Sequence, residues 1–281
     1  MSGWSNGFAE WVEDDTAYLS IVFSWRLPDA YQRAVWFKAQ GYTVRVGGPA
    51  VWANRKYLAS VAEIGGDADA LIHHNPHATI ASRGCPVGCW FCVVPTMEGK
   101  EFTLLWDFTP RPILCDNNLS ALPVEFQEHI IQRYQETNTQ LLDANSGFEP
   151  RTFDEDTYHR WKAINRGPWR FALDEAKELE DVRRMMQILK DEPANSKRVY
   201  VLIGNEPVEA CHERILKVIE WGGEPHVQPL MALNTLVKHP LVRHDWTEAK
   251  LKNMARWANR WIWRTVPFEE YRYNHGLPPP A

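Results

Sequence analysis

Three closely spaced cysteines are the residues of this chain best suited to chemistry. Cys85, Cys89 and Cys92 lie in the segment Arg83-Gly-Cys-Pro-Val-Gly-Cys-Trp-Phe-Cys92, with the spacing C-x3-C-x2-C. Soft thiolate ligands suit iron–sulfur sites, and three of them on one tight loop can hold three irons of a [4Fe–4S] cluster. The fourth iron then lacks a nearby protein thiolate, which leaves it open to a substrate or a cofactor.

A structural zinc site is the main alternative for the same cysteines. Such sites use four ligands, usually arranged as two close pairs. Here the third cysteine follows the second at once, and the nearby histidines, His73, His74 and His77, all lie upstream. The spacing therefore favours an iron–sulfur cluster over zinc. A non-enzymatic iron–sulfur or zinc module, for electron transfer or for bracing the fold, remains open.

The motif resembles that of the radical S-adenosylmethionine (radical SAM) superfamily. It follows a strand expected at residues 78–82, and Phe91 places an aromatic residue just before the last cysteine. The resemblance implies that S-adenosylmethionine chelates the fourth iron and that Phe91 contacts this cofactor. It also implies an electron donor such as flavodoxin or ferredoxin. The electron cleaves the cofactor's carbon–sulfur bond and gives a 5′-deoxyadenosyl radical, which abstracts hydrogen from a substrate.

The resemblance further implies cofactor-binding residues at the ends of three later strands. The Gly-Gly-Glu-like segment that binds the methionyl amino group is replaced here by Leu114-Cys-Asp-Asn-Asn118, which offers a carboxylate and two amides. The strand before Asp174-Glu175 is expected to end near the ribose hydroxyls. Residues 199–206 resemble the family's G-x-I-x-G-x-x-E strand near the adenine, without its first glycine. The expected cofactor-binding residues are Phe91, Asp116, Asn117, Asn118, Asp174, Glu175, Gly204 and Asn205. No catalytic residue is assigned.

Strands and helices alternate along most of the chain, which predicts an α/β fold with parallel strands. Residues 76–235 carry six β/α steps and fit the partial (β/α)6 TIM-like barrel that the resemblance implies. The expected strands are 78–82, 111–115, 140–142, 169–173, 198–203 and 226–230, and the expected helices are 124–136, 154–164, 178–189 and 208–221. Residues 236–281 are expected to form a helical extension, with a helix at about 247–263, and a loose tail.

Residues 1–75 are expected to form a small Rossmann-like α/β unit. Its expected strands are 18–23, 43–46 and 70–72, with a helix from Leu27 to about Gly41. Gly47-Gly48 is predicted to be a tight turn at the end of the second strand. The unit resembles a shortened form of the cobalamin-binding domain that precedes many radical SAM barrels. The D-x-H-x-x-G ligand motif of that domain is absent, so we expect a sheet that packs on the barrel and no bound cobalamin.

Composition limits the compartment and the partners. The 281 residues carry a net charge of −5, so no general positive field draws the protein to nucleic acid or to an anionic membrane. No apolar stretch approaches the ~20 residues of a membrane helix, and the first residues lack the apolar region of a signal peptide. We therefore expect a cytoplasmic protein without a membrane partner.

Taken together, these features predict a radical SAM enzyme whose substrate the sequence does not identify. A radical enzyme that modifies nucleic acid is the second alternative. Methylthiolating relatives of that kind carry a second cysteine triad, whereas only Cys115 and Cys211 remain here. Both are isolated in the chain, and we expect them to be packing residues.

Overall fold

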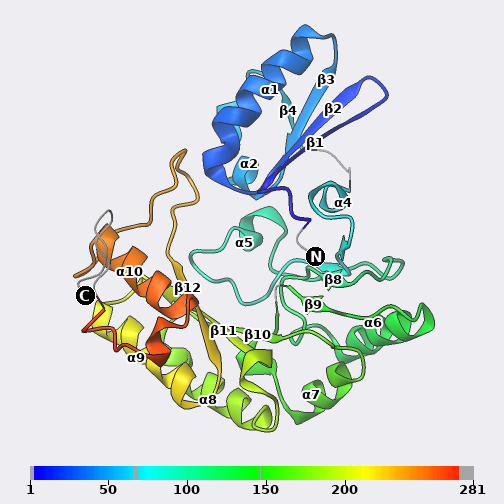
Figure 1. Ribbon diagram of the computed structural model, residues 1–281. Coiled ribbons are helices and arrows are strands. Elements are labelled where there is room, and N and C mark those ends of the chain that lie inside the picture. The colour runs from blue at the N-terminus through cyan, green and yellow to red at the C-terminus, as the bar shows by residue number, and fades with distance from the viewer. Residues whose placement is uncertain (1–2, 66–68, 146, 272–281) are drawn as a thin grey trace. The chain divides into compact units, whose positions relative to one another are not determined.

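The computed structural model describes residues 3–65, 69–145 and 147–271 (Figure 1). The chain divides into two compact units, and each is described by itself. The first unit comprises Met1–Asn118, Leu122–Ser146 and Ala232–Lys238, and the second comprises Leu119–Ala121, Gly147–Met231 and His239–Ala281. The domain boundaries expected near residues 75 and 235 stay predictions.

A four-stranded sheet with the order β1-β2-β3-β4 begins the first unit. β1 (Phe8–Glu13) and β2 (Thr16–Ile21) form an antiparallel hairpin, to which β3 (Thr43–Gly47) and β4 (Glu63–Ile64) add in parallel. α1 (Leu27–Ala39) contacts β2 and β3 (Figure 1). It contributes four buried side chains to the apolar core of this sheet, namely Leu27, Ala30, Ala34 and Phe37.

Two expectations for this region are wrong. Residues 70–72 are not a strand, because the backbone turns into the short helix α4 (Leu71–His74), and β4 occupies the place beside β3 instead. The second is that no strand was expected at β1, because the start of the chain is polar. Its pairing with β2 depends on a tight turn at Asp14, whose φ of 50° lies in the left-handed region.

The tight turn predicted at Gly47-Gly48 is confirmed. Gly48 has a φ of +97°, and a Cβ atom there would lie 2.5 Å from the carbonyl oxygen of Ile21. The close approach of the two backbones therefore requires glycine at this position. The chain then enters the short helices α2 (Pro49–Ala53) and α3 (Arg55–Leu58).

The first unit also contains a parallel sheet with the order β5-β8-β9. Its strands are short, namely β5 (Ala78–Thr79), β8 (Ile113–Leu114) and β9 (Asp143–Ala144). Beyond β5 the chain forms the antiparallel hairpin of β6 (Ser82–Arg83) and β7 (Thr103–Leu104). Two helices accompany these strands, α5 (Val94–Met97) and α6 (Val124–Glu136).

The second unit is built on the parallel sheet β10-β11-β12. These strands are β10 (Trp169–Leu173), β11 (Lys197–Ile203) and β12 (Glu224–Pro229). Its α-helices are α7 (Glu155–Lys162), α8 (Leu179–Ile188), α9 (Val208–Glu220) and α10 (Glu248–Asn259). Side-chain caps fix two helix starts, since the Asp154 carboxylate accepts from the Thr157 amide and the Thr247 hydroxyl accepts from the Lys250 amide.

The architecture is mixed α/β with parallel sheets, as expected, but no closed barrel forms among the described residues. Six parallel strands form two three-stranded sheets, β5-β8-β9 and β10-β11-β12. The strand expected at 140–142 is displaced, since β9 comprises Asp143–Ala144. β5, β8 and β9 have two residues each, so their ladders are short. Five 3-10 helices complete the described secondary structure, Ser24–Arg26, Pro150–Thr152, Ala176–Glu178, Ala194–Ser196 and Ile262–Arg264.

Candidate functional site

The three closely spaced cysteines lie on one loop between β6 and α5. At the start of this loop Gly84 has a φ of +85°, and a Cβ atom there would lie 2.1 Å from the carbonyl oxygen of Glu101. Glycine at this position therefore lets the start of the loop lie directly against the segment that leads from α5 to β7. The Cys85 amide donates to the carbonyl of Gly99 at 3.3 Å across the same gap. Within the loop, Gly88 also has a positive φ, of +68°.

Backbone and side-chain N–H groups point at the sulfurs of Cys85 and Cys92. The Val94 amide donates to Cys92 Sγ at 3.4 Å, and Asn118 Nδ2 donates to Cys85 Sγ at 3.9 Å. The Cys92 amide donates to the carbonyl of Cys89 at 3.0 Å, which closes a turn between these two cysteines. Sulfur is the acceptor in the first two of these contacts, and the thiolate is the form of cysteine that binds metal.

The residues fit an iron–sulfur cluster by their chemistry and by their shared loop. All three thiols are partly exposed and none forms a disulfide. No group of three or more His, Cys, Asp or Glu side chains within the described residues is arranged to hold a metal ion. The fit is therefore one of ligand type and sequence position, and the side chains do not form a ready-made metal site.

Glu98 holds the two ends of the cysteine loop together. Its side chain is only 10% exposed, and Oε2 accepts from the Gly84 amide at 3.0 Å and from Asn117 Nδ2 at 2.6 Å. Its other oxygen accepts from Arg83 Nη1 at 3.0 Å. Sequence reasoning missed this residue, since no motif marks it. The only available signal was an acidic side chain shortly after the last cysteine.

Asp116 supports the backbone that leads into the loop. Its carboxylate is fully buried and accepts from the Ala81 amide at 2.9 Å and from the Ser82 hydroxyl at 2.5 Å. Burial raises the pKa of Asp116 to about 6, and these hydrogen bonds oppose part of that rise. The structure thus gives Asp116 a structural role, and the contact to a cofactor ammonium stays a prediction.

The neighbouring amides and the loop aromatics also lie beside the cysteines. Asn117 Nδ2 donates to the Gly84 carbonyl at 3.2 Å in addition to Glu98, so Asn117 positions the loop. Phe91 is half-buried, and Trp90 packs edge-on against it with ring centroids 5.4 Å apart. Trp90 is 55% exposed, which leaves much of one large aromatic face at the loop surface.

The expected ribose contacts lie in the second unit, after β10. The amides of Asp174 and Glu175 both donate to Glu178 Oε2, at 2.7 and 3.1 Å. The pKa of Asp174 is raised to about 7, first by burial and then by the negative charge of Glu178, while Arg214 opposes the rise. An Asp with this pKa exchanges a proton near neutral pH and can either donate to or accept from a hydroxyl.

Arg214 ties the ends of β10 and β11 together and was also missed. Its side chain is completely buried, with Nη1 donating to the Leu173 carbonyl at 2.6 Å and Nη2 pairing with Glu206 Oε2 at 3.0 Å. Nη2 also donates to Asn205 Oδ1 at 3.3 Å, while Asn205 Nδ2 donates to the Asp174 carbonyl at 2.6 Å. The amide of Asn205 is thus engaged within the protein.

The eight expected cofactor residues fall into two groups. Asn117 and Asn118 contact the cysteine loop, and Phe91 is part of it. Asp116 accepts a hydrogen bond from the Ala81 amide, in the segment that precedes the loop. Asp174, Glu175 and Asn205 form the second group, together with Gly204, a buried glycine with a φ of +91°. The first group lies in the first unit and the second group in the second unit.

Comparisons with known proteins support the fold. No family model and no curated protein matches the chain. Among solved structures, it is similar to the radical S-adenosylmethionine methyltransferase TsrM from Kitasatospora setae, determined with cobalamin and a [4Fe–4S] cluster bound. The TM-score is 0.60 at 10% sequence identity, over 77% of this chain and 64% of that one, so the chain spans less than two thirds of its neighbour's length. At this sequence identity the similarity is one of fold alone.

Across the described ranges 3–65, 69–145 and 147–271, no helix has both the length and the apolar character needed to span a bilayer.

Proposed function

We propose that this protein is a radical SAM enzyme that binds a [4Fe–4S] cluster through Cys85, Cys89 and Cys92. The observation that carries the proposal is the shared cysteine loop, held at its base by Glu98 and Asn117, in a fold similar to that of a radical SAM enzyme. A [4Fe–4S] cluster bound there would supply one electron for the cleavage of S-adenosylmethionine to methionine and a 5′-deoxyadenosyl radical, which would abstract hydrogen from the substrate.

In this proposal each group of residues has its own task. Asn118 and the Val94 amide donate hydrogen bonds to two of the proposed ligand sulfurs. Phe91 would contact the cofactor at the loop, and Asp116 and Asn117, which follow β8, would bind its methionyl group. Asp174 and Glu175 would contact the ribose diol, and the Gly204–Asn205 turn would accommodate the adenine. Arg214 maintains this turn and the end of β10 in one arrangement.

The proposed partners are an electron donor of the flavodoxin or ferredoxin kind and a substrate, within the cytoplasm. The net charge of −5 argues against nucleic acid as that substrate. A donor is needed because the protein's own side chains cannot supply a low-potential electron to the cluster.

The similarity to a methyltransferase raises methyl transfer from cobalamin as a second candidate function. In the N-terminal unit the buried His74 has both ring nitrogens engaged, Nδ1 with the Ser5 hydroxyl at 2.5 Å and Nε2 with the Ser20 hydroxyl at 2.8 Å. This histidine is therefore occupied in joining two segments, and it is not placed to bind cobalt. We propose that the enzyme works without cobalamin, and absorbance after incubation with hydroxocobalamin tests this point.

The central experiment is anaerobic reconstitution with iron and sulfide, followed by reduction with dithionite and addition of S-adenosylmethionine. We expect one [4Fe–4S] cluster per chain, a changed electron paramagnetic resonance (EPR) spectrum with the cofactor, and 5′-deoxyadenosine detected by mass spectrometry. A stable cluster that never yields 5′-deoxyadenosine would contradict the enzyme and would favour the alternative, a non-enzymatic iron–sulfur module for electron transfer or for bracing the fold. One zinc per chain and no iron after reconstitution would overturn the cluster itself.

A further inference from the structure

The parallel sheet of the second unit has one apolar face and one polar face. Successive residues of a strand point to opposite faces, and buried residues alternate along β10. The helices α8 and α9 connect the strands in the order β10-β11-β12, so right-handed crossovers place both helices on the same side of the sheet. The apolar face consists of almost fully buried side chains, namely Trp169, Phe171, Leu173, Val199, Val201, Ile203 and Val227.

The opposite face carries a cluster of half-buried polar side chains. Tyr200 of β11 pairs in register with His226 of β12, and Arg198 precedes Tyr200 by two residues, so all three share this face. Arg170 of β10 lies beside Arg198. The Arg170 guanidinium donates to the Tyr200 hydroxyl, and the rings of Tyr200 and His226 are in edge contact with centroids 4.9 Å apart. Three neighbouring strands therefore contribute to one polar cluster.

Three hydrogen-bond donors of this cluster have no acceptor in the part of the chain that the structure describes. Arg198 makes no hydrogen bond or ion pair there, and neither ring nitrogen of His226 is hydrogen-bonded. The Tyr200 oxygen accepts from Arg170, which leaves the phenolic proton to donate elsewhere. Because these side chains are only half-buried, their donors are within reach of a ligand.

Positive charge prevails around these donors. Glu224 is the carboxylate beside Arg198 in the strand register, but its Oε1 accepts from Arg264 Nη2 at 3.2 Å and it forms no ion pair with Arg198. Burial lowers the pKa of His226, and the positive charges of Arg198 and Arg170 lower it further. The imidazole thus senses both guanidinium groups.

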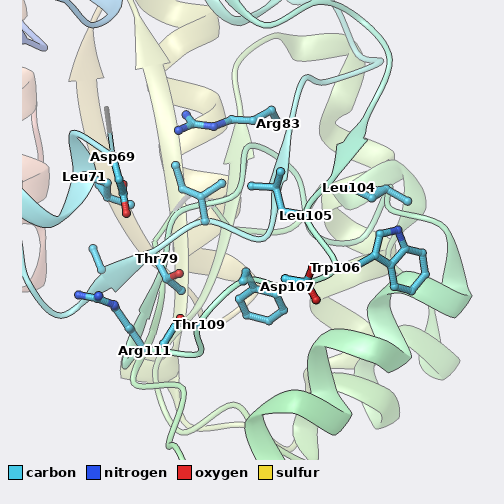
Figure 2. A pocket seen from close by; sticks show the side chains of 13 residues that line it. Asp69, Leu71, Thr79, Arg83, Leu104, Leu105, Trp106, Asp107, Thr109 and Arg111 are labelled. Carbon is cyan, nitrogen blue, oxygen red and sulfur yellow. The ribbon is translucent and has the colours of Figure 1, made fainter. Parts of the chain in front are cut away.

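The cleft of the first unit has a different balance of charge. It has a volume of about 710 Å³, and its lining contains Asp69 and Asp107 as well as Arg83 and Arg111 (Figure 2). Arg83 is also paired with Glu98. Neither sign of charge prevails in that cleft, whereas the polar face of the second sheet presents donors beside positive charge.

We propose that Arg198, Tyr200 and His226 form a binding site for an oxyanion, namely the carboxylate or phosphate group of a small ligand. A guanidinium binds either group through paired N–H donors. The Tyr200 hydroxyl and one nitrogen of a neutral imidazole each add a further donor. The chemistry shared by the two groups is a compact negative charge spread over at least two oxygens.

The identity of this ligand as the substrate rests on the proposed function, whereas anion binding itself does not. Tyr200 pairs in register with Ala172, which precedes Asp174 by two residues on the same face. A parallel strand rises about 3.3 Å per residue, so the oxyanion would lie about 7 Å along the strand from the level of Asp174. The reacting atom would then be a few bonds from the anionic group, which makes the substrate class a small carboxylate or phosphate compound.

The probes are succinate and inorganic phosphate, each titrated into the reconstituted protein at constant ionic strength. NMR of the chain labelled with ¹³C at histidine Cε1 follows the imidazoles, and the resonance that His226→Gln removes belongs to His226. A bound anion favours the imidazolium, so the pKa of His226 should rise when the site is saturated. The probe that raises this pKa identifies the group as a carboxylate or a phosphate.

A charge substitution measures the contribution of the guanidinium. Arg198→Gln should lower the affinity for the bound anion by at least about 10-fold, as measured by calorimetric titration, because it removes a charge-assisted hydrogen bond. Arg183→Gln is the matched control on α8, since Arg183 is exposed and pairs with Glu180. This control should bind the anion as tightly as the parent.

A pKa of His226 that neither probe changes would overturn the oxyanion site, and so would equal affinities of Arg198→Gln and Arg183→Gln. The His226 titration is made on the parent protein, so poor folding of a variant cannot decide the outcome. 5′-Deoxyadenosine is measured in parallel. If it forms but neither anion binds, the oxyanion site fails alone. If an anion binds as expected but no 5′-deoxyadenosine ever forms, the proposed function fails alone.

Discussion

Glu98 Oε2 accepts a hydrogen bond from Asn117 Nδ2 at 2.6 Å, and this contact joins the cysteine loop to the end of β8. The same oxygen accepts from the Gly84 amide, immediately before Cys85. One carboxylate therefore fixes the position of the loop relative to the segment after β8 that carries Asp116, Asn117 and Asn118. The geometry of the cysteines depends on a residue outside the cysteine motif.

Glu98→Gln should lower iron content after anaerobic reconstitution. The glutamine amide would place an N–H donor against the donors of Gly84, Asn117 or Arg83, and it removes the charge that strengthens these bonds. Hydrogen bonds to a charged group contribute about 1.5–3 kcal/mol each, so we also expect a lower free energy of unfolding of that order. Glu101→Gln, an exposed change between α5 and β7, is the matched control. Equal iron per chain in both variants would contradict the clamp.

Each of the three loop cysteines should be necessary for the cluster. Cys85→Ala, Cys89→Ala and Cys92→Ala should each abolish the reconstituted iron–sulfur absorbance and EPR signal, because a cubane left with two thiolates is not held. Cys115→Ala and Cys211→Ala should retain both. Cys211 is fully buried on α9, as expected for a packing residue, and Cys115 is partly exposed after β8. Loss of iron in either of these two variants would indicate a site closed by four thiolates.

Regular elements were predictable where the local pattern carries the information. Residues 124–136 form α6 with the expected limits, since Phe126, Ile130 and Tyr134 recur at helical spacing and are all buried. Strand β10 also has its expected limits, and buried residues alternate along it. The expectation of a strand at residues 70–72 was wrong, because a short apolar run does not specify which segment pairs with β3.

The supporting contacts of the site could not be predicted, because they join residues far apart in the sequence. Glu98 and Asn117 are 19 residues apart, and Arg214 and Leu173 are 41 apart. Arg214 sits on a helix with several charged neighbours and resembles a solvent-facing residue in the sequence, yet it is fully buried. The cysteine ligands were accessible to sequence reasoning because their geometry is local to one loop.

Asp116→Asn should lower the free energy of unfolding by about 1–3 kcal/mol. The buried carboxylate accepts from both the Ala81 amide and the Ser82 hydroxyl, and an asparagine would direct its amide N–H at one of these donors. Urea denaturation of the parent and the variant measures the difference. The role expected from the sequence, accepting from the cofactor ammonium, predicts instead an unchanged unfolding free energy and cofactor binding weakened about 10- to 150-fold. Calorimetric titration with S-adenosylmethionine separates the two roles.

Arg214→Met should destabilise the protein strongly. The substitution leaves Glu206 without its cation and leaves the Leu173 carbonyl without its donor, in a buried setting. Breaking a buried ion pair by removing one partner costs about 3–5 kcal/mol. Lys217→Met on the same helix removes the exposed pair with Glu220, and such pairs contribute about 0–1 kcal/mol. Similar denaturation midpoints for the two variants would show that Arg214 does not hold the strand ends together.

Asp174 should make stability depend on pH in a defined window. Its folded-state pKa of about 7 lies above the ordinary value of 3.8, so the folded chain binds more protons than the unfolded chain between about pH 4 and pH 7. Stability from this residue is therefore fully present below pH 4 and is lost as the pH rises to 7. Asp174→Asn has no such titration, so its free energy of unfolding relative to the parent should rise between pH 4 and pH 7 and then stay constant. Urea denaturation of both proteins across this range tests the prediction, and a constant difference at every pH would show that the Asp174 carboxyl titrates normally.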